Sequence, residues 1–413
     1  METSKSKLLT PLLAWFLLAM ILANIAGQML YTLLAVYLSE LGASVTQVGL
    51  VFTLASIVPM ALQIFGGWLS DSIGRLKTIA IGATIASFSY IIFPLAPTWH
   101  WVLAALCLEY VSHSLGGPSF GAFIADQSSE ENRGKVFGIS QGIFMVVGII
   151  GPVLGGLLAE RYGFRIMLAV AGSIYVLASV LRVAMALRVK EMAALGGDPP
   201  SLSSLRSNLG AMLVLLFSGG VLSWIFITDG VRDIAFNLST NLEPLYISQV
   251  GGLSVAQIGV LHSIFSFAMM LIMLPAGWLS DRLGERTPIV AGFALQVGAM
   301  GIFLAARQFW AFATYSFLFG IGVGIMAPAY NALMSKVVPE KNRGVAFGLF
   351  YTSLGFISLP APWIGARLWE MFGPRIPFLL TAAAMLVSIF PAWFKFRLPA
   401  KTEAKVAGCQ GGT

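Results

Sequence analysis

The chain contains the stretch GWLSDSIGR at residues 67–75, and 210 positions later it contains GWLSDRLGER at residues 277–286. The same offset maps the stretch NRG at residues 132–134 onto NRG at residues 342–344. An offset that holds along most of each half indicates two structurally equivalent units that arose by duplication. The sequence therefore predicts a fold made of two related halves.

The composition is typical of a membrane protein. Hydrophobic residues make up 57% of the 413 residues and charged residues only 10%, whereas charged residues make up about a quarter of a soluble domain. Apolar runs of roughly 20 residues recur between Gly, Pro and charged residues, as membrane-spanning helices require. We predict an all-α integral membrane protein with twelve spans, near residues 11–38, 46–69, 77–96, 101–124, 136–159, 165–188, 222–247, 255–279, 287–306, 310–334, 345–369 and 375–397.

The twelve predicted spans divide into two pseudo-symmetric six-helix bundles. We expect the first bundle over residues 1–190, a cytoplasmic linker over 191–205, the second bundle over 206–400 and a disordered cytoplasmic tail over 401–413. A Gly- and Pro-containing segment inside the linker separates the two helical blocks. Duplicated halves in such an apolar chain are the architecture of a secondary transporter.

Charge and cysteine content narrow the class further. Most of the 25 Lys and Arg residues fall on the side of the predicted spans that also holds both termini. The positive-inside rule makes this side the cytoplasm, and we expect a multi-pass protein of the plasma (inner) membrane. The net charge of +7 is then a topology signal, and no nucleic-acid partner is expected. The two cysteines build no metal site.

The seventh span allows two registrations. Hydropathy alone would end it near Asp229. The repeat instead matches YLS at residues 37–39 with YIS at residues 246–248, which places the span on 222–247. We adopt the second registration, and the sequence leaves open whether the helix is broken near Gly219-Gly220.

The seventh span also carries a stripe of polar residues. Asp229, Asp233, Asn237 and Asn241 recur every four residues and therefore share one helix face. Arg232 lies three residues from Asp229, within reach of an ion pair. Ionisable groups in a membrane mark an ion or substrate path or an internal pair. Either the stripe is structural, or Asp233, which has no partner on its own helix, exchanges a proton for a cation.

Two further polar sets lie in the first half. By the repeat, Asn24 and Gln28 of the first span are equivalent to Asp233 and Asn237, near the bilayer midplane. Glu109 and His113 are four residues apart in the fourth span and share a face. A histidine titrates near neutral pH and can pass charge to such a carboxylate. The alternative is a polar pair that only fixes helix packing.

The motif at residues 67–75 resembles the signature of the major facilitator superfamily, and the likeness covers essentially the whole chain. The resemblance implies two domains that rock about a central cavity lined by the first, fourth, seventh and tenth spans. It makes Asp71 and Asp281 gate residues that hold the cytoplasmic side shut. Glu285 replaces the equivalent of Arg75 in the second copy, which we expect to weaken that latch. The gating-motif residues implied are Gly67, Asp71, Gly74, Arg75, Arg133, Gly277, Asp281, Gly284 and Arg343.

The fifth span contains a second motif, made of Gly151, Pro152, Gly155 and Gly156. It resembles the antiporter motif of proton-coupled drug exporters, in which small residues let helices approach and proline bends the span. Those exporters also carry an arginine in the fourth span, and this chain has none there. Arg232 or Glu109 would have to replace it.

The leading hypothesis is a secondary active transporter that works by alternating access and exports cationic or amphipathic small molecules in exchange for protons. The alternative is a symporter or facilitator for a polar or anionic metabolite bound by Arg232. An intramembrane enzyme is disfavoured because no His-Glu-x-x-His motif occurs, and a transport-inactive receptor would need an added domain. We expect a monomer in the lipid bilayer, with protons and a small-molecule substrate as partners and no cofactor or metal.

Overall fold

The structure is a computed structural model that describes residues 9–189, 220–337 and 357–396. The predicted linker 191–205, the tail 401–413 and Arg343 lie outside these residues. The first bundle consists of α1 (Pro11–Tyr31), α2 (Leu34–Glu40), α3 (Val45–Ile73), α4 (Arg75–Leu95), α5 (Trp99–Asp126), α6 (Arg133–Tyr162) and α7 (Phe164–Arg188). The second consists of α9 (Gly220–Ser239), the 3-10 turn η1 (Thr240–Leu242), α10 (Glu243–Gln249), α11 (Val255–Leu283), α12 (Arg286–Ala305), α13 (Phe309–Val337), α15 (Ala361–Phe372) and α16 (Ile376–Lys395).

Each predicted span corresponds to a helix or a broken helix in the described ranges, and α15 represents the end of the eleventh. Eight of the described helices are long and apolar enough to cross a membrane, or nine if the bent α3 counts as one span. The helix α9 does not pass this test, because Asp229, Arg232 and Asp233 lie within its 20 residues. The all-helical fold predicted from the sequence is confirmed.

The first and seventh spans are each broken near one end rather than continuous. A break at Thr32-Leu33 separates α1 from α2, and η1 separates α9 from α10. Pro244 lies in the first turn of α10, and since proline has no N–H it cannot continue the hydrogen bonding of α9. The registration of the seventh span on 222–247 agrees with α9 to α10. Asn241, however, lies in η1, so the predicted four-residue stripe ends at Asn237.

The sequence repeat is visible in local geometry. The motif glycines Gly74 and Gly284 both have a positive φ, 101° and 73°, where α3 turns into α4 and α11 into α12. Only glycine adopts such angles without strain. The helices α3 and α11 both begin at a capping box, Ser44–Gln47 and Ser254–Gln257. The two halves therefore share their helix starts and turns at the same 210-residue offset.

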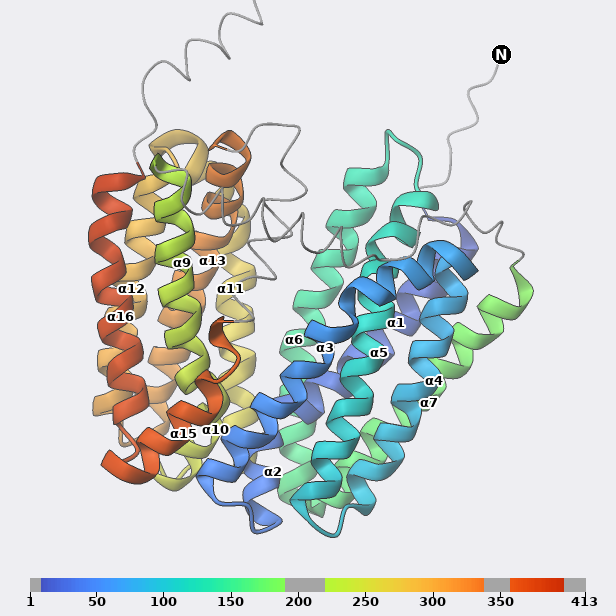
Figure 1. Cartoon of the computed structure of the whole chain (residues 1–413), viewed down its shortest axis with the longest axis horizontal. Helices are drawn as coiled ribbons and strands as arrows, with labels where there is room; N and C mark the ends of the chain where they lie inside the picture. Colours follow the sequence, from blue (N-terminus) through green and yellow to red (C-terminus); the bar gives the residue numbers. More distant parts are fainter. Residues whose placement is uncertain (1–8, 190–219, 338–356, 397–413) are drawn as a thin grey trace, which may run out of the picture.

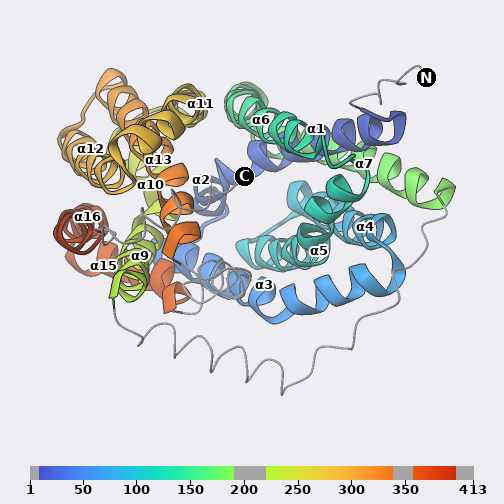
Figure 2. The ribbon, with the colours of Figure 1, turned by 90° about the horizontal axis from the view of Figure 1, so that it is seen from above.

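The two bundles lie side by side and contact each other at one end (Figure 1). We call the end that holds Gly74 and Gly284 the motif end, and the end that holds the capping boxes of α3 and α11 the cap end. The bundles converge at the cap end and diverge toward the motif end (Figure 1). Seen from above, α6 faces α11 across the boundary between the bundles (Figure 2).

The helix pairs α6 with α11 and α3 with α15 make most of the contact between the bundles. A Cβ atom added to Gly259 would lie 2.3 Å from the carbonyl oxygen of Pro152, and one added to Gly49 would lie 2.5 Å from that of Pro362. Real Cβ atoms do not approach so closely, so both positions require glycine. The two contacts are equivalent by the repeat, and the interface is therefore pseudo-symmetric.

The span-five motif places α6 between two neighbours. Cβ atoms on Gly151 and Gly155 would collide with Gln28 and Met29 of α1, at 2.5 and 2.9 Å. One on Gly156 would lie 2.9 Å from the carbonyl oxygen of Val255 in α11. The expectation that these small residues permit close helix approach is confirmed, on one face within the first bundle and on the other between the bundles.

Two carboxylates cap helices of the opposite bundle at the cap end. Glu160 of α6 accepts hydrogen bonds from the Ser254 hydroxyl at 2.5 Å and the Ala256 N–H at 2.8 Å. Glu370 of α15 accepts from the N–H and hydroxyl of Thr46, at 2.9 and 2.5 Å. A carboxylate at a helix N-terminus satisfies free N–H groups and faces the positive end of the helix dipole. The pair again obeys the 210-residue offset.

We predict that replacing both caps, Glu160→Ala with Glu370→Ala, loosens the cap end. Spin labels at the exposed positions Leu95 and Trp310, in a background without native cysteines, report the distance between the bundles there. The double variant should give a broader distribution with a new, longer component, because the N–H groups of α3 and α11 lose their charged acceptors. The control is Glu130→Ala with Glu131→Ala at the motif end. An unchanged distribution in the cap variant would show that the glycine contacts alone hold this end.

Candidate functional site

Each bundle contains a cavity. The first cavity measures about 310 Å³ and is lined by α1, α4, α5, α6 and α7. The second cavity measures about 320 Å³ and is lined by α9, α12, α13 and α16. Both volumes lie at the lower end of the roughly 300–1,000 Å³ typical of small-molecule sites. In the described ranges no group of three His, Cys, Asp or Glu side chains could hold a metal ion.

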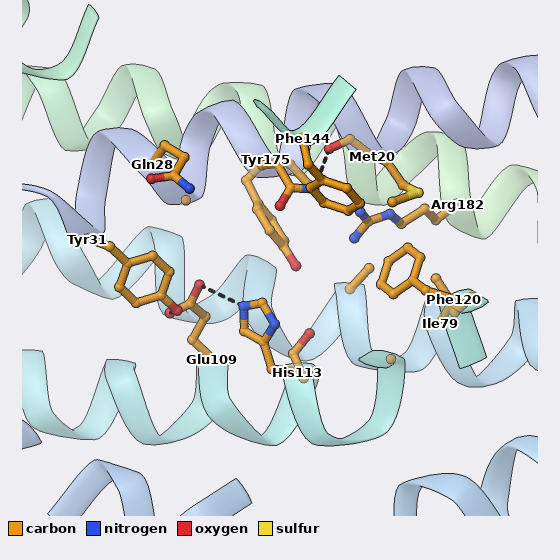
Figure 3. A pocket seen from close by; sticks show the side chains of 16 residues that line it. Met20, Gln28, Tyr31, Ile79, Glu109, His113, Phe120, Phe144, Tyr175 and Arg182 are labelled. Atoms are coloured by element: carbon orange, nitrogen blue, oxygen red, sulfur yellow. Dashed lines mark hydrogen bonds and ion pairs between the residues drawn. The ribbon is translucent and has the colours of Figure 1, made fainter. Parts of the chain in front are cut away.

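Glu109 is the central polar group of the first cavity (Figure 3). It is only 1% exposed and accepts a hydrogen bond from the Tyr31 hydroxyl. His113 Nε2 lies 3.7 Å from Glu109 Oε1, as the four-residue spacing on α5 predicts. Glu109 lies ten residues into α5 from Trp99, about 15 Å along the axis and so near the middle of a core of about 30 Å. The acid thus contacts neutral or titratable groups rather than a permanent cation.

Tyr31 and Arg182 line the first cavity and were not among the site residues predicted from the sequence. Tyr31 is seven residues after Asn24 and three after Gln28, so all three line the cavity from one face of α1. This spacing could have identified Tyr31. Arg182 of α7 lines the cavity opposite α5 (Figure 3). Its place inside a predicted span was a signal, but no residue in its own sequence neighbourhood suggested a partner.

The second cavity is lined by Arg232, Asp233 and Tyr330 among others. Arg232 Nη2 lies 2.5 Å from Asp229 Oδ1, and the Asp229 side chain is almost fully buried. The guanidinium also lies over the Tyr330 ring, 5.5 Å from its centroid. The ion pair expected from the three-residue spacing therefore forms. Asp233 faces the cavity, and no described Lys, Arg or His lies within ion-pair distance of it.

The side-chain amides of Asn24 and Asn237 donate hydrogen bonds to the backbone of their own helices. The Asn24 side chain donates to the Met20 carbonyl oxygen at 2.8 Å, and Asn237 donates to that of Asp233 at 2.9 Å. Both are four-residue back-bonds. Asn24 and Gln28 line the first cavity, whereas Asn237 and Asn241 line neither cavity. The structure thus brings only part of the predicted set into the two cavities.

At the motif end the two copies of the gating motif carry equivalent ion pairs. Arg75 Nε lies 2.6 Å from Asp126 Oδ2, and Lys336 Nζ lies 2.5 Å from Glu285 Oε1. These four positions correspond at the 210-residue offset with acid and base exchanged. An ion pair is therefore kept in the second copy because residue 336 is a lysine, and the weaker second latch expected from Glu285 stays a prediction.

Three of the other gating residues are exposed at the motif end. Asp71 and Asp281 are exposed, and no ion pair joins either to another described residue. Arg133 is exposed at the start of α6. This is the arrangement expected where the bundles are apart at the motif end.

The chain matches the sequence model of the Major Facilitator Superfamily over residues 16–231 and 225–411. The chain belongs to the Major Facilitator Superfamily. It is 25% identical to "Multidrug resistance protein MdtG" of Escherichia fergusonii, with 96% of each chain covered. It is also 25% identical to "Multi-drug resistance efflux pump PmrA" of Streptococcus pneumoniae, covering 95% of this chain and 97% of that protein.

Solved structures agree on the fold. The nucleoside transporter NupG superposes with a TM-score of 0.78 at 14% identity, over 94% of this chain and all of that one. Identity at this level shows the fold alone. The structural similarity and the family match together confirm a multi-pass membrane transporter of two related helical bundles. The superfamily resemblance stated from the motif at residues 67–75 is therefore confirmed.

We predict that Lys336→Ala lowers the apparent thermal midpoint of the detergent-solubilised protein. The substitution leaves the buried Glu285 carboxylate without its cation, with a loss of about 1 kcal/mol because the lysine itself is half exposed. The exchanged double variant, Glu285→Lys with Lys336→Glu, should recover most of the midpoint, since it recreates the arrangement of Arg75 and Asp126. A double variant no more stable than Lys336→Ala would contradict the equivalence of the two pairs.

Proposed function

We propose that this superfamily member is a secondary active transporter that exports cationic or amphipathic small molecules from the cytoplasm in exchange for protons, by alternating access. The names of the relatives support export of several drugs. The observation that carries proton coupling is Glu109, a carboxylate 1% exposed at mid-membrane with Tyr31 and His113 beside it. An acid without a permanent counter-ion can release its proton when a cationic cargo arrives.

The conformation supports alternating access. By the positive-inside rule the motif end lies in the cytoplasm. The bundles are then closed toward the outside, through the glycine contacts and the Glu160 and Glu370 caps, and apart toward the cytoplasm. We infer that this is the inward-facing state that loads cargo. Rocking about the interface would separate α6 from α11 and bring the exposed Asp71 and Asp281 toward the opposite bundle.

Asp233 is the equivalent candidate in the second bundle. It faces the second cavity, while its neighbour Asp229 is neutralised by Arg232. The same ion pair disfavours the alternative of a facilitator for anions, because the Arg232 charge is already satisfied. We therefore assign Glu109 and Asp233 as the proton-exchanging groups and Asp229–Arg232 as a structural pair.

The test is the internal pH of proteoliposomes when a cationic rhodamine methyl ester is added. The unmodified protein should move protons against the dye. Glu109→Gln and Asp233→Asn should each reduce this movement about a hundredfold or more, the size typical of losing one proton-transfer group. The matched control is Glu131→Gln in the loop before α6, which should not change it.

The results for the two variants distinguish the roles of Glu109 and Asp233. Proton movement that is normal in Glu109→Gln and lost in Asp233→Asn would remove the role of Glu109 alone. Normal proton movement in both variants would contradict both assignments. Dye counterflow without any proton signal in the unmodified protein would identify a facilitator.

A further inference from the structure

Arg182 of α7 is a buried cation with no role in the function proposed above. Its side chain is 5% exposed. It lies six residues before the end of α7 at Arg188, about 9 Å along the helix axis and so inside the hydrocarbon core. A charged group at this depth costs free energy unless it is paired, and it usually marks a substrate or ion path.

The surroundings of Arg182 hold its guanidinium but do not neutralise it. Nη2 lies 3.4 Å from the Ala19 carbonyl oxygen, a long hydrogen bond, and Nε has no hydrogen-bond partner among the described residues. The rings of Phe120 and Tyr175 lie with centroids 5.3 and 6.0 Å from its central carbon. Cation–π contacts of this kind attract the cation without cancelling its charge. No described carboxylate lies within ion-pair distance.

Arg182 and Arg232 differ in whether a carboxylate pairs with them. Both arginines lie inside membrane-spanning helices and beside a tyrosine or phenylalanine ring. Arg232 is paired with Asp229 at 2.5 Å, whereas Arg182 keeps an unused donor. A planar guanidinium with free donors binds carboxylate and related anions through paired hydrogen bonds.

Arg182 shares its cavity with Glu109. Glu109 and His113 line one side of the first cavity and Arg182 the other, with Tyr175 between them (Figure 3). The cavity therefore presents a carboxyl group and a guanidinium cation to one bound molecule. Its remaining wall is partly apolar and aromatic, with Phe120 and Phe144, and also carries the polar side chains of Asn24, Gln28 and Ser112.

We propose that the first cavity binds small zwitterionic amphiphiles, with the anionic group, a carboxylate or its phosphonate equivalent, on Arg182 and the amine near Glu109. The proposal rests on the proposed function, because it names the cargo of the same cavity. It narrows that cargo from cationic amphiphiles in general to those that also carry an anion. The apolar wall then holds the body of the molecule, and the cavity volume limits it to a small one.

Two dyes with the same ring system test this directly: a rhodamine with a free carboxylate and its methyl ester. The free acid is a zwitterion and the ester is a cation. Concentration-dependent uptake of each dye is measured in proteoliposomes with the motif end facing the dye. The protein should take up the free acid with a KM about tenfold or more below that of the ester, as one charge-assisted hydrogen bond predicts. Arg182→Gln should abolish this preference by raising the KM for the free acid alone.

Two variants make the result specific. Arg182→Lys keeps the charge and should retain part of the preference, while Arg188→Gln at the exposed end of the same helix should leave both dyes unchanged. Uptake of the ester by Arg182→Gln shows that the variant is folded. A protein that prefers the ester, or an Arg182→Gln variant that loses both dyes equally, would overturn the zwitterion site while proton-coupled uptake of the ester still supported the proposed function. Uptake of neither dye by the unmodified protein would overturn both.

Discussion

The close contact of α6 with α11 and of α3 with α15 is the constraint on which the rest of the structure depends. At Gly259 and Gly49 the backbone of one bundle lies against a proline carbonyl of the other, with no room for a side chain. Lipid offers no hydrophobic force between helices, so packing at small residues and hydrogen bonds must hold such an interface. The carboxylates of Glu160 and Glu370 add charged hydrogen bonds at its edge. Because the contact is confined toward the cap end, the bundles are free to part at the other.

The charged side chains divide into those with an ion-pair partner and those without one, and the division follows their position. Asp229 with Arg232, Arg75 with Asp126 and Glu285 with Lys336 are paired within one bundle. Glu109 and Arg182 lack such a partner, and both line the first cavity. Structural pairs stabilise the bundles, whereas charges left without a fixed partner inside the hydrocarbon core are available to a proton or a cargo.

Local patterns in the sequence predict the fold well and the site only in part. The repeat and the apolar runs define the helices, because period and length are local properties, and the three-residue spacing predicts Asp229–Arg232. The pairing of Glu285 with Lys336 joins residues 51 positions apart, so the motif alone does not reveal the partner of Glu285. The hydrogen bond from Tyr31 to Glu109 and the position of Arg182 in the same cavity are likewise contacts between residues far apart in the sequence. Asn241 left the predicted stripe because Pro244 ends the regular helix.

We expect the two ends of the molecule to open in opposition. Spin-label distances measured in one preparation test it, with one pair at Leu95 and Trp310 across the cap end and another at Glu131 and Leu283 across the motif end. When cargo and a proton gradient are supplied, the cap-end distance should lengthen as the motif-end distance shortens. The fraction of molecules open at the cap end should equal the fraction closed at the motif end. Distances that change together, or a cap end that never opens during transport, would contradict the account.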